Sequence, residues 1–281
     1  MTNPSPRASE LVAQERDQLA NLDHGYPANH FAWKVVRDRA RERGATSLVE
    51  IGVGAGNGVA HVLDAGMTFA GIDNDEACVT ATQSALASLG HDPAAVIHAD
   101  IEVPSTLTGL THAGEFDALM ALGIMPHVDD AEAVVRTMES LVRPGGDMFL
   151  EFRNSLFSLV TFNRLTRQFI VDDLLENVSD TTRERVGAFV DERVDLARPP
   201  LSAHGSEPHY ANPLAMVEWC EHLGFTDVSV HPFHYHAAMP VLEQEDPQAF
   251  RDESIALESD SSGWRGLFLC SVFLLRATRP T

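Results

Sequence analysis

The sequence predicts an α/β fold in which helices flank an open, doubly wound sheet of seven strands. Short apolar runs of strand length alternate with longer segments of helical spacing between residues 46 and 152, and this alternation is typical of parallel βα units. A glycine-rich turn, VEIGVGAGNGV at residues 49–59, follows the first of these runs. The apolar content of 44% and the charged content of 22% are ordinary for a globular protein.

Two helices are expected before the sheet. Leucines spaced along one face predict a helix over residues 8–23. The segment HGYPANH at residues 24–30 breaks this helix, and a second helix follows over residues 31–43. Gly44 is typical of the residue that ends a helix. Residues 1–45 are therefore expected to form an N-terminal helical segment.

The turn after the first strand has a glycine at every second position from Gly52 to Gly58. Glycine adopts positive φ and lets a ligand approach the bare backbone. In an open α/β sheet such a turn lies at the carboxyl ends of the strands, where ligands bind. The dinucleotide fingerprint Gly-x-Gly-x-x-Gly/Ala fails in both registers, because its sixth position is Asn57 or Val59. The phosphate-loop pattern that ends in Gly-Lys-Ser/Thr is absent.

Acidic residues end the strands that follow. The second strand, residues 68–73, ends at Asp73, where a carboxylate can accept both hydroxyls of a ribose. An acidic residue about 20 positions beyond the glycine turn does this in other nucleotide-binding folds. The later strands are expected at residues 95–101, which end in Asp100 and Ile101, at residues 115–123, and at residues 147–152 after the turn RPGG.

The series Glu50-x-Gly52-x-Gly54-x-Gly56, followed by Asp73, resembles the class I S-adenosylmethionine (AdoMet)-dependent methyltransferases. The resemblance covers residues 45–152 by motif and residues 210–276 by topology only. It implies a Rossmann-like sheet and AdoMet as the cofactor. In the family, the acid after the third strand holds the adenine with its neighbour. The residues that the resemblance assigns to the cofactor are Glu50, Gly52, Gly54, Gly56, Asp73, Asn74, Asp100, Ile101, Leu122 and Gly123.

After residue 152 the alternation stops for a segment too long for an ordinary connection. Residues 153–208 have apolar positions at helical spacing, so we expect helices that form a lid over the strand ends. Residues 209–281 complete the sheet, and four parts are expected in all: 1–45, 46–152, 153–208 and 209–281. The last part should contain a helix at 213–225 and strands at 226–231 and 267–276.

Methyl transfer needs an acceptor atom held in line with the methyl group, and a hydroxyl acceptor also benefits from a base, usually His. An amine acceptor needs only to lose its proton. His127 follows the fourth strand, as a His-Val pair does in the family, so it is the first candidate for the base, followed by His234 and His236. A metal site is not expected, because no Asp-Asn pair like that of the metal-dependent O-methyltransferases follows the fourth strand. The candidates for contact with the acceptor are Tyr26, His30, Arg153, Asn154, His209 and Tyr210.

The formal net charge of −21 argues against a nucleic-acid substrate, since nucleic acids bind to clusters of Lys and Arg. No apolar run reaches the roughly 18–20 residues of a membrane helix, and the first ten residues lack the apolar core of a signal peptide. The three cysteines are widely spaced and suggest free thiols in a reducing compartment. We therefore expect a cytoplasmic protein without membrane or nucleic-acid partners, for which a homodimer is one open arrangement.

The favoured hypothesis is AdoMet-dependent methyl transfer to an O or N atom of a polar small molecule of the sugar or secondary-metabolite type. The alternative is a non-catalytic AdoMet-binding or structural partner protein with the same fold. A dehydrogenase is disfavoured by the failed dinucleotide fingerprint. The tail after the fourth strand, Gly-Ile-Met-Pro-His, also lacks the Asn/Asp-Pro-Pro-Tyr pattern of enzymes that methylate nucleic-acid bases or protein amides.

Overall fold

The computed structural model describes residues 28–196, 208–258 and 263–281. The helix predicted over residues 8–23 and the candidate Tyr26 lie outside this part of the chain. The chain divides into two compact units. The sheet unit consists of residues 29–152, 215–231 and 274–281, and the insertion unit contains the described residues of 153–214 and 232–273.

The strands form the predicted doubly wound sheet, in the order β3-β2-β1-β4-β5-β8-β7, with a short additional strand, β6, paired with β5. Neighbouring strands from β3 through β5 pair in parallel. The strand order reverses between β1 and β4, and such a switch point is where open α/β sheets bind ligands. The strands are β1 (Ser47–Ile51), β2 (Thr68–Asp73), β3 (Val96–His98), β4 (Phe116–Ala121), β5 (Val142–Asn154), β6 (Tyr210–Ala211), β7 (Thr226–Tyr235) and β8 (Cys270–Thr278).

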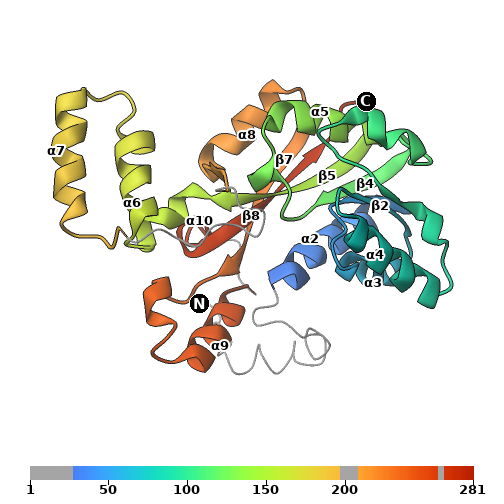
Figure 1. The fold of residues 1–281 in the computed structure, drawn as a ribbon, viewed down its shortest axis with the longest axis horizontal. Coiled ribbons are helices and arrows are strands. Elements are labelled where there is room, and N and C mark those ends of the chain that lie inside the picture. The colour runs from blue at the N-terminus through green and yellow to red at the C-terminus, as the bar shows by residue number, and fades with distance from the viewer. Residues whose placement is uncertain (1–27, 197–207, 259–262) are drawn as a thin grey trace, which may run out of the picture. The chain divides into compact units, whose positions relative to one another are not determined.

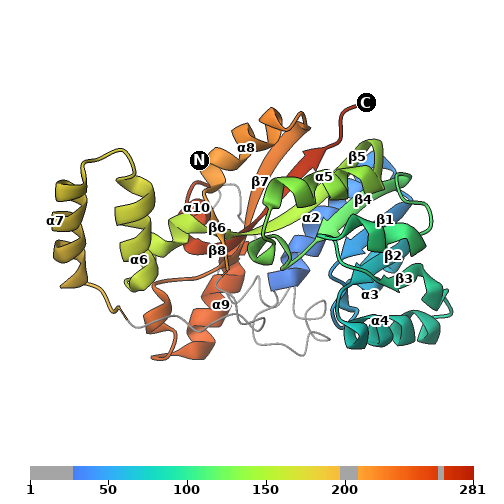
Figure 2. The same cartoon turned by 45° about the horizontal axis from the view of Figure 1, so that its top comes forward.

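Helices cover both faces of the sheet. Figures 1 and 2 show α2, α3 and α4 on one face and α5 and α8 on the other. Because both faces are covered, the central strands are apolar on both sides: Leu48, Val49 and Ile51 of β1 are at most 1% exposed. These helices are α2 (Ala28–Arg43), α3 (Asn57–Asp64), α4 (Glu76–Ser88), α5 (Ala131–Leu141) and α8 (Pro213–His222).

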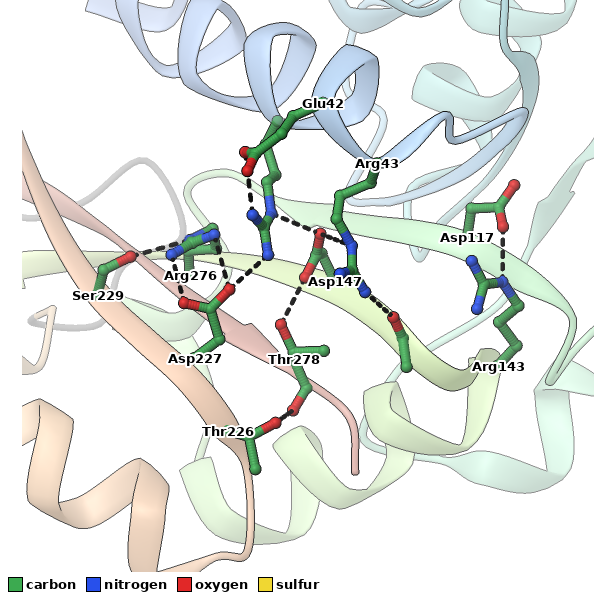
Figure 3. A network of polar contacts seen from close by, with 12 residues as sticks. Glu42, Arg43, Asp117, Arg143, Asp147, Thr226, Asp227, Ser229, Arg276 and Thr278 are labelled. Atoms are coloured by element: carbon green, nitrogen blue, oxygen red, sulfur yellow. Dashed lines mark hydrogen bonds and ion pairs between the residues drawn. The ribbon is translucent and has the colours of Figure 1, made fainter. Parts of the chain in front are cut away.

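Charged side chains are densely paired at the amino ends of β4, β5 and β7 (Figure 3). We call this set the basal network, and its members are Arg39, Glu42, Arg43, Asp117, Arg143, Asp147, Asp227, Arg276 and Thr278. Asp147 is 4% exposed and accepts hydrogen bonds from Arg39 Nε at 2.9 Å and from Thr278 Oγ1 at 2.6 Å. Arg276 donates to Asp227 at 3.0 Å. These contacts fasten α2 to β5 and β7 to β8, so the basal network holds elements of the sheet unit together.

The insertion unit is helical after β5, as predicted. Its elements are a 3-10 helix, η4 (Ser155–Val160), the helix α6 (Arg164–Gln168), a π-helical turn, η5 (Phe169–Leu174), and α7 (Asp180–Asp191). Figures 1 and 2 show α6 and α7 side by side. Arg167 of α6 pairs with Asp191 of α7, with a distance of 2.5 Å between Nε and Oδ1. The expected lid function of residues 153–208 stays a prediction.

The strand predicted at residues 267–276 is wrong at its start. Gly266–Leu269 form a short helix, α10, and β8 begins at Cys270. The apolar run alone favours a strand, but the amide of Asn154 donates to the carbonyl oxygens of Leu267 and Cys270, both at 2.8 Å, and so fixes a turn there. The helix α9 (Pro247–Glu258) was not predicted.

Other boundaries differ by a few residues. The helix expected at 31–43 begins at Ala28, within the segment 24–30 that was expected to separate the two helices. The third strand ends at His98, so Asp100 lies in the turn after it. No helix within the described ranges combines the length and the apolar character that a membrane crossing requires.

Candidate functional site

The glycine turn between β1 and α3 has a backbone that few other residues could adopt. Gly52, Gly54 and Gly56 have φ angles of 77°, 50° and 82°. L-residues with a side chain rarely occupy this left-handed region, whereas glycine enters it without a steric penalty. The sequence therefore specifies the shape of the turn directly.

The glycines of this turn have different surroundings. A side chain at Gly52 would collide with Ile124, and one at Gly58 would collide with Glu50 and Trp33. A Cβ at Gly54 would meet no atom of the described residues within 4 Å. Gly52 and Gly58 therefore permit close packing, whereas Gly54 leaves the backbone open to a ligand. Gly58 belongs to the first turn of α3 and not to the loop.

Asp73 lies at the rim of the glycine turn. Its Oδ2 accepts a hydrogen bond from Gly54 N and its Oδ1 from Asp75 N, both at 2.9 Å. A carboxylate has about four lone-pair sites, so acceptor capacity remains for two further donors. Asn74, the next residue, is exposed, and its carbonyl oxygen lies 2.9 Å from His98 Nε2.

The turn after β3 lies beside this rim. Ala99 N donates to Asp73 O at 2.9 Å, which joins the ends of β2 and β3. Asp100 is half-buried and accepts from Glu102 N at 2.9 Å, while Ile101 is 6% exposed. A half-buried carboxylate next to an apolar side chain can bind an amino group and cover a flat ring.

Glu50 is the buried acid of the site. It is 4% exposed, and its Oε2 has no hydrogen-bond partner among the described residues. Burial first and the charge of Asp73 second raise the pKa of Glu50 well above its usual value. The carboxyl group is therefore protonated more readily than an exposed glutamate, and a cationic ligand nearby would favour its ionised form.

The turn after β4 completes this edge. Ile124 contacts Gly52 through its side chain and accepts the backbone hydrogen bond of His127 at 2.9 Å. His127 is half-buried in the 3-10 turn η3 (Met125–His127), and Leu122 is half-buried before it. Gly123 has a φ of 69° and open space around its Cβ position. The structure thus brings the ends of β1, β2, β3 and β4 together, as the sequence predicts.

One aromatic residue and one histidine that sequence reasoning missed, Trp33 and His61, lie where α2 packs on α3, and Trp33 lies close to Gly58. Trp33 of α2 is 1% exposed and stacks on His61 of α3, with 5.6 Å between ring centroids. Burial and the nearby Arg37 lower the pKa of His61 to about 4. The candidate His30 is 4% exposed in the same layer, and burial likewise lowers its pKa. Their side chains meet only because α2 packs on α3, which local sequence does not reveal.

The insertion unit gathers three other predicted residues. The rings of His234 and His236 stack with 5.1 Å between centroids. Burial, followed by the charges of His236 and Arg153, lowers the pKa of His234 to about 3. Burial lowers that of His236 to about 4. His234 has a φ of 58°, an uncommon backbone conformation for a histidine.

The remaining candidates of this unit are placed differently. Asn154 is 1% exposed, and its side chain bonds the backbone of Leu267, Cys270 and Leu156. This geometry favours a structural role for Asn154 over contact with an acceptor. Tyr210 is exposed and pairs with Arg153 in the β5–β6 ladder, and His209 beside it is exposed.

Curated relatives match part of the chain. The ubiquinone biosynthesis O-methyltransferase of Methylobacterium nodulans is 32% identical over 126 residues, which is 44% of this chain and 44% of that protein. The protein of the same name from Aromatoleum aromaticum is 35% identical over 69 residues, 25% of this chain and 30% of that one. The chain thus spans less than half the length of these relatives.

Solved structures align over more of the chain at lower identity. A SAM dependent methyltransferase from Archaeoglobus fulgidus is 16% identical, with 88% of this chain and 94% of that chain covered and a TM-score of 0.46. An S-adenosylmethionine dependent methyltransferase from Mesorhizobium loti is 14% identical, with 84% and 91% covered and a TM-score of 0.48.

Residues 49–148 match a family model described as a methyltransferase domain. The matched segment begins in β1, contains the glycine turn and Asp73, and ends in β5. It therefore includes the whole edge of the sheet at which the predicted cofactor residues meet. The sheet order and the glycine turn agree with this match, so residues 49–148 are similar to a methyltransferase domain.

Proposed function

We propose that the protein transfers a methyl group from AdoMet to an oxygen or nitrogen atom of a polar small molecule. The observation that carries this proposal is the open space beside the backbone of Gly54. Asp73 accepts a hydrogen bond from Gly54 N, and the buried Glu50 belongs to the strand that leads into the same turn. An open glycine turn admits a ligand, and the two acids suit a ligand that has ribose hydroxyls and a positive charge.

The residues present fit AdoMet. Asp73 would accept the ribose hydroxyls with its remaining lone pairs, and Asp100 with Ile101 would hold the adenine. The Oε2 atom of Glu50 has no partner among the described residues, and the ionised carboxylate would attract the positive charge at the methionine end of AdoMet. Leu122 and Gly123 would line the same end from β4. AdoMet supplies a methyl group on a sulfonium centre, which needs no activation by the protein.

The proposed base for a hydroxyl acceptor is His127. It belongs to the turn that packs on Gly52, at the edge where the cofactor residues meet. His234 and His236 have pKa values of about 3 and about 4, so they are neutral at pH 7 but accept a proton weakly. Because catalytic bases work best with a pKa near the working pH, these two histidines suit binding better than proton removal.

The names of the relatives and the net charge of the chain support one class of acceptor over others. The matching curated proteins are named as O-methyltransferases, which favours an oxygen acceptor in a biosynthetic reaction, such as a sugar or a secondary metabolite. The net charge of −21 disfavours nucleic acid. We expect this reaction in the cytoplasm, with a homodimer as one arrangement of the enzyme.

Turnover tests the proposal. The protein is incubated with AdoMet and a small-molecule extract of bacterial cells, and S-adenosylhomocysteine and singly methylated products are measured by mass spectrometry. We expect both to appear together. A protein that binds AdoMet but releases no S-adenosylhomocysteine with any extract would instead fit the alternative, a non-catalytic AdoMet-binding partner.

A further inference from the structure

Arg153, at the end of β5, carries a charge that no acidic side chain in the described part of the chain neutralises. It is half-buried, its Nε is inaccessible to solvent, and it has neither an ion pair nor a side-chain hydrogen bond among the described residues. A guanidinium stays charged in proteins, and a partly desolvated charge without a partner costs free energy. The chain has 41 acidic residues against 20 basic ones, so an arginine with no acidic partner among the residues that the structure describes is unexpected.

The histidine on which the charge of Arg153 acts does not supply a negative charge that could neutralise it. Its charge acts on His234, whose pKa is lowered to about 3 by burial, by His236 and by Arg153 itself. His234 is therefore neutral at pH 7. The left-handed backbone of His234, with φ of 58°, is a kind of strain that often occurs at ligand-binding positions.

His236 offers hydrogen bonds that the described protein does not use. Both of its ring nitrogens are buried and lack a hydrogen-bond partner among the described residues. Its ring is held by Phe157 at 4.6 Å, His234 at 5.1 Å and Phe250 at 6.1 Å between centroids. A neutral imidazole presents one donor and one acceptor, which matches a hydroxyl group. Buried polar groups are nearly always satisfied by protein, water or a ligand.

We propose that Arg153 and His236 bind the methyl acceptor, and that this acceptor is a small hydroxylated anion. Arg153 pairs with its carboxylate or phosphate group, and His236 hydrogen-bonds its hydroxyl. The inference rests on the proposed methyl transfer, which it deepens by naming the charge of the substrate. An arginine suits either anion, because its planar donors match both geometries.

Charge-separated extracts test the proposal. A bacterial small-molecule extract is divided by ion exchange into anionic, neutral and cationic pools, and S-adenosylhomocysteine release is measured with each. The anionic pool should support turnover. Arg153→Gln should raise the KM for that pool about ten- to a hundredfold, with kcat largely kept, since a charged hydrogen bond is lost. Arg153→Lys should recover part of the loss, and Arg265→Gln, an exposed arginine of the same unit, should behave like wild type.

Phosphatase treatment of the anionic pool distinguishes the two anions, because it removes a phosphorylated acceptor and spares a carboxylate. Turnover with the neutral or cationic pool, unchanged in Arg153→Gln, would overturn the anionic acceptor and leave methyl transfer intact. Absence of turnover with every pool, in a protein that binds AdoMet, would overturn the proposed function itself.

A second measurement tests the arrangement without turnover. NMR titration of the histidine rings should show the pKa of His234 rising in Arg153→Gln, because a nearby positive charge is removed. The same titration in Arg265→Gln should match wild type. A His234 pKa that does not respond to Arg153→Gln would contradict the proximity on which the inference depends.

Discussion

Within the sheet unit, the acidic side chains at the two edges of the sheet differ in whether they have hydrogen-bond partners. At the amino ends of the strands, Asp147 is bound by Arg39 and Thr278, and Asp117 by Arg143 and Thr46. At the carboxyl ends, Glu50 is buried with one oxygen unpartnered among the described residues. The comparison indicates which charges stabilise the fold alone and which are left for a ligand to complete, since perturbed and unsatisfied groups concentrate at functional sites.

The largest expected effect concerns catalysis at the carboxyl edge. For a hydroxyl acceptor, His127→Ala should lower kcat by roughly 10²–10⁴-fold, because the base is removed, and should leave AdoMet affinity within a few-fold. Steady-state kinetics and calorimetry measure the two quantities. His91→Ala, an exposed histidine of the same unit, is the matched control. A His127→Ala enzyme with unchanged kcat and KM would leave His127 a structural role.

An effect of similar size, but on the free energy of unfolding and not on catalysis, is expected at the amino ends of the strands. Asp147→Ala should lower the free energy of unfolding by about 3–5 kcal/mol, because it removes the buried partner of Arg39 and leaves the buried hydroxyl of Thr278 without its acceptor. Glu42→Ala removes an exposed partner of the same arginine and should cost less than about 1 kcal/mol. Chemical denaturation measures both. Equal losses would show that burial does not distinguish the two ion pairs.

A smaller effect, on AdoMet affinity, is expected for Asp73 at the carboxyl edge of the sheet, which we call the ligand edge. Asp73→Ala should weaken AdoMet binding about ten- to a hundredfold, since hydrogen bonds to a charged acceptor contribute roughly 1.5–3 kcal/mol. Asp75→Ala removes the N-cap of α4 nearby, so it should reduce stability and leave AdoMet affinity unchanged. Wild-type affinity in Asp73→Ala would show that the ribose lies elsewhere.

The contributions of Asp117 and Glu50, at the two edges of the sheet, to the free energy of unfolding should change with pH in opposite directions. Although burial opposes its ionisation, hydrogen bonds from Thr46 and Arg143 lower the pKa of Asp117 to about 2. Its contribution is therefore present above pH 4 and lost as the pH falls through about 2. Asp117→Asn should lower the free energy of unfolding at pH 7 by about 2 kcal/mol and have little effect at pH 2.

Glu50 should show the reverse pH dependence, with stability lost as the pH rises. Its folded pKa is raised, so its contribution is present below pH 4.5 and lost as the pH rises through the raised value. Without a ligand, Glu50→Gln should be more stable than wild type at pH 8 and should bind AdoMet more weakly. Thermal unfolding across pH measures this. A wild type that gains stability relative to Glu50→Gln as the pH rises would contradict the predicted direction.

The ligand edge could be predicted from the sequence because its signals are local. The positive φ of Gly52, Gly54 and Gly56 requires glycine, and Asp73 directly ends an apolar run. Strand β2 was predicted with its observed bounds for the same reason. Spacing between βα units then indicated that these strand ends meet.

The basal network and the insertion unit could not be predicted in this way. Arg39 and Asp147 are 108 positions apart, and nothing local indicates their pairing. The side chain of Asn154 was interpreted as a ligand contact, whereas it holds backbone groups more than 110 positions away. Long-range contacts of this kind are set by packing, which also turned the start of the last predicted strand into the helix α10.

One titration tests the central claim that the open glycine turn binds AdoMet. Calorimetry with S-adenosylhomocysteine and with NAD compares wild type, Gly54→Val and Gly66→Val. Gly66 also has positive φ, 79°, and open space around its Cβ position, but it lies at the far end of α3. We predict that wild type and Gly66→Val bind S-adenosylhomocysteine, that Gly54→Val does not, and that none binds NAD. Binding of NAD without S-adenosylhomocysteine, or undiminished binding by Gly54→Val, would contradict the account.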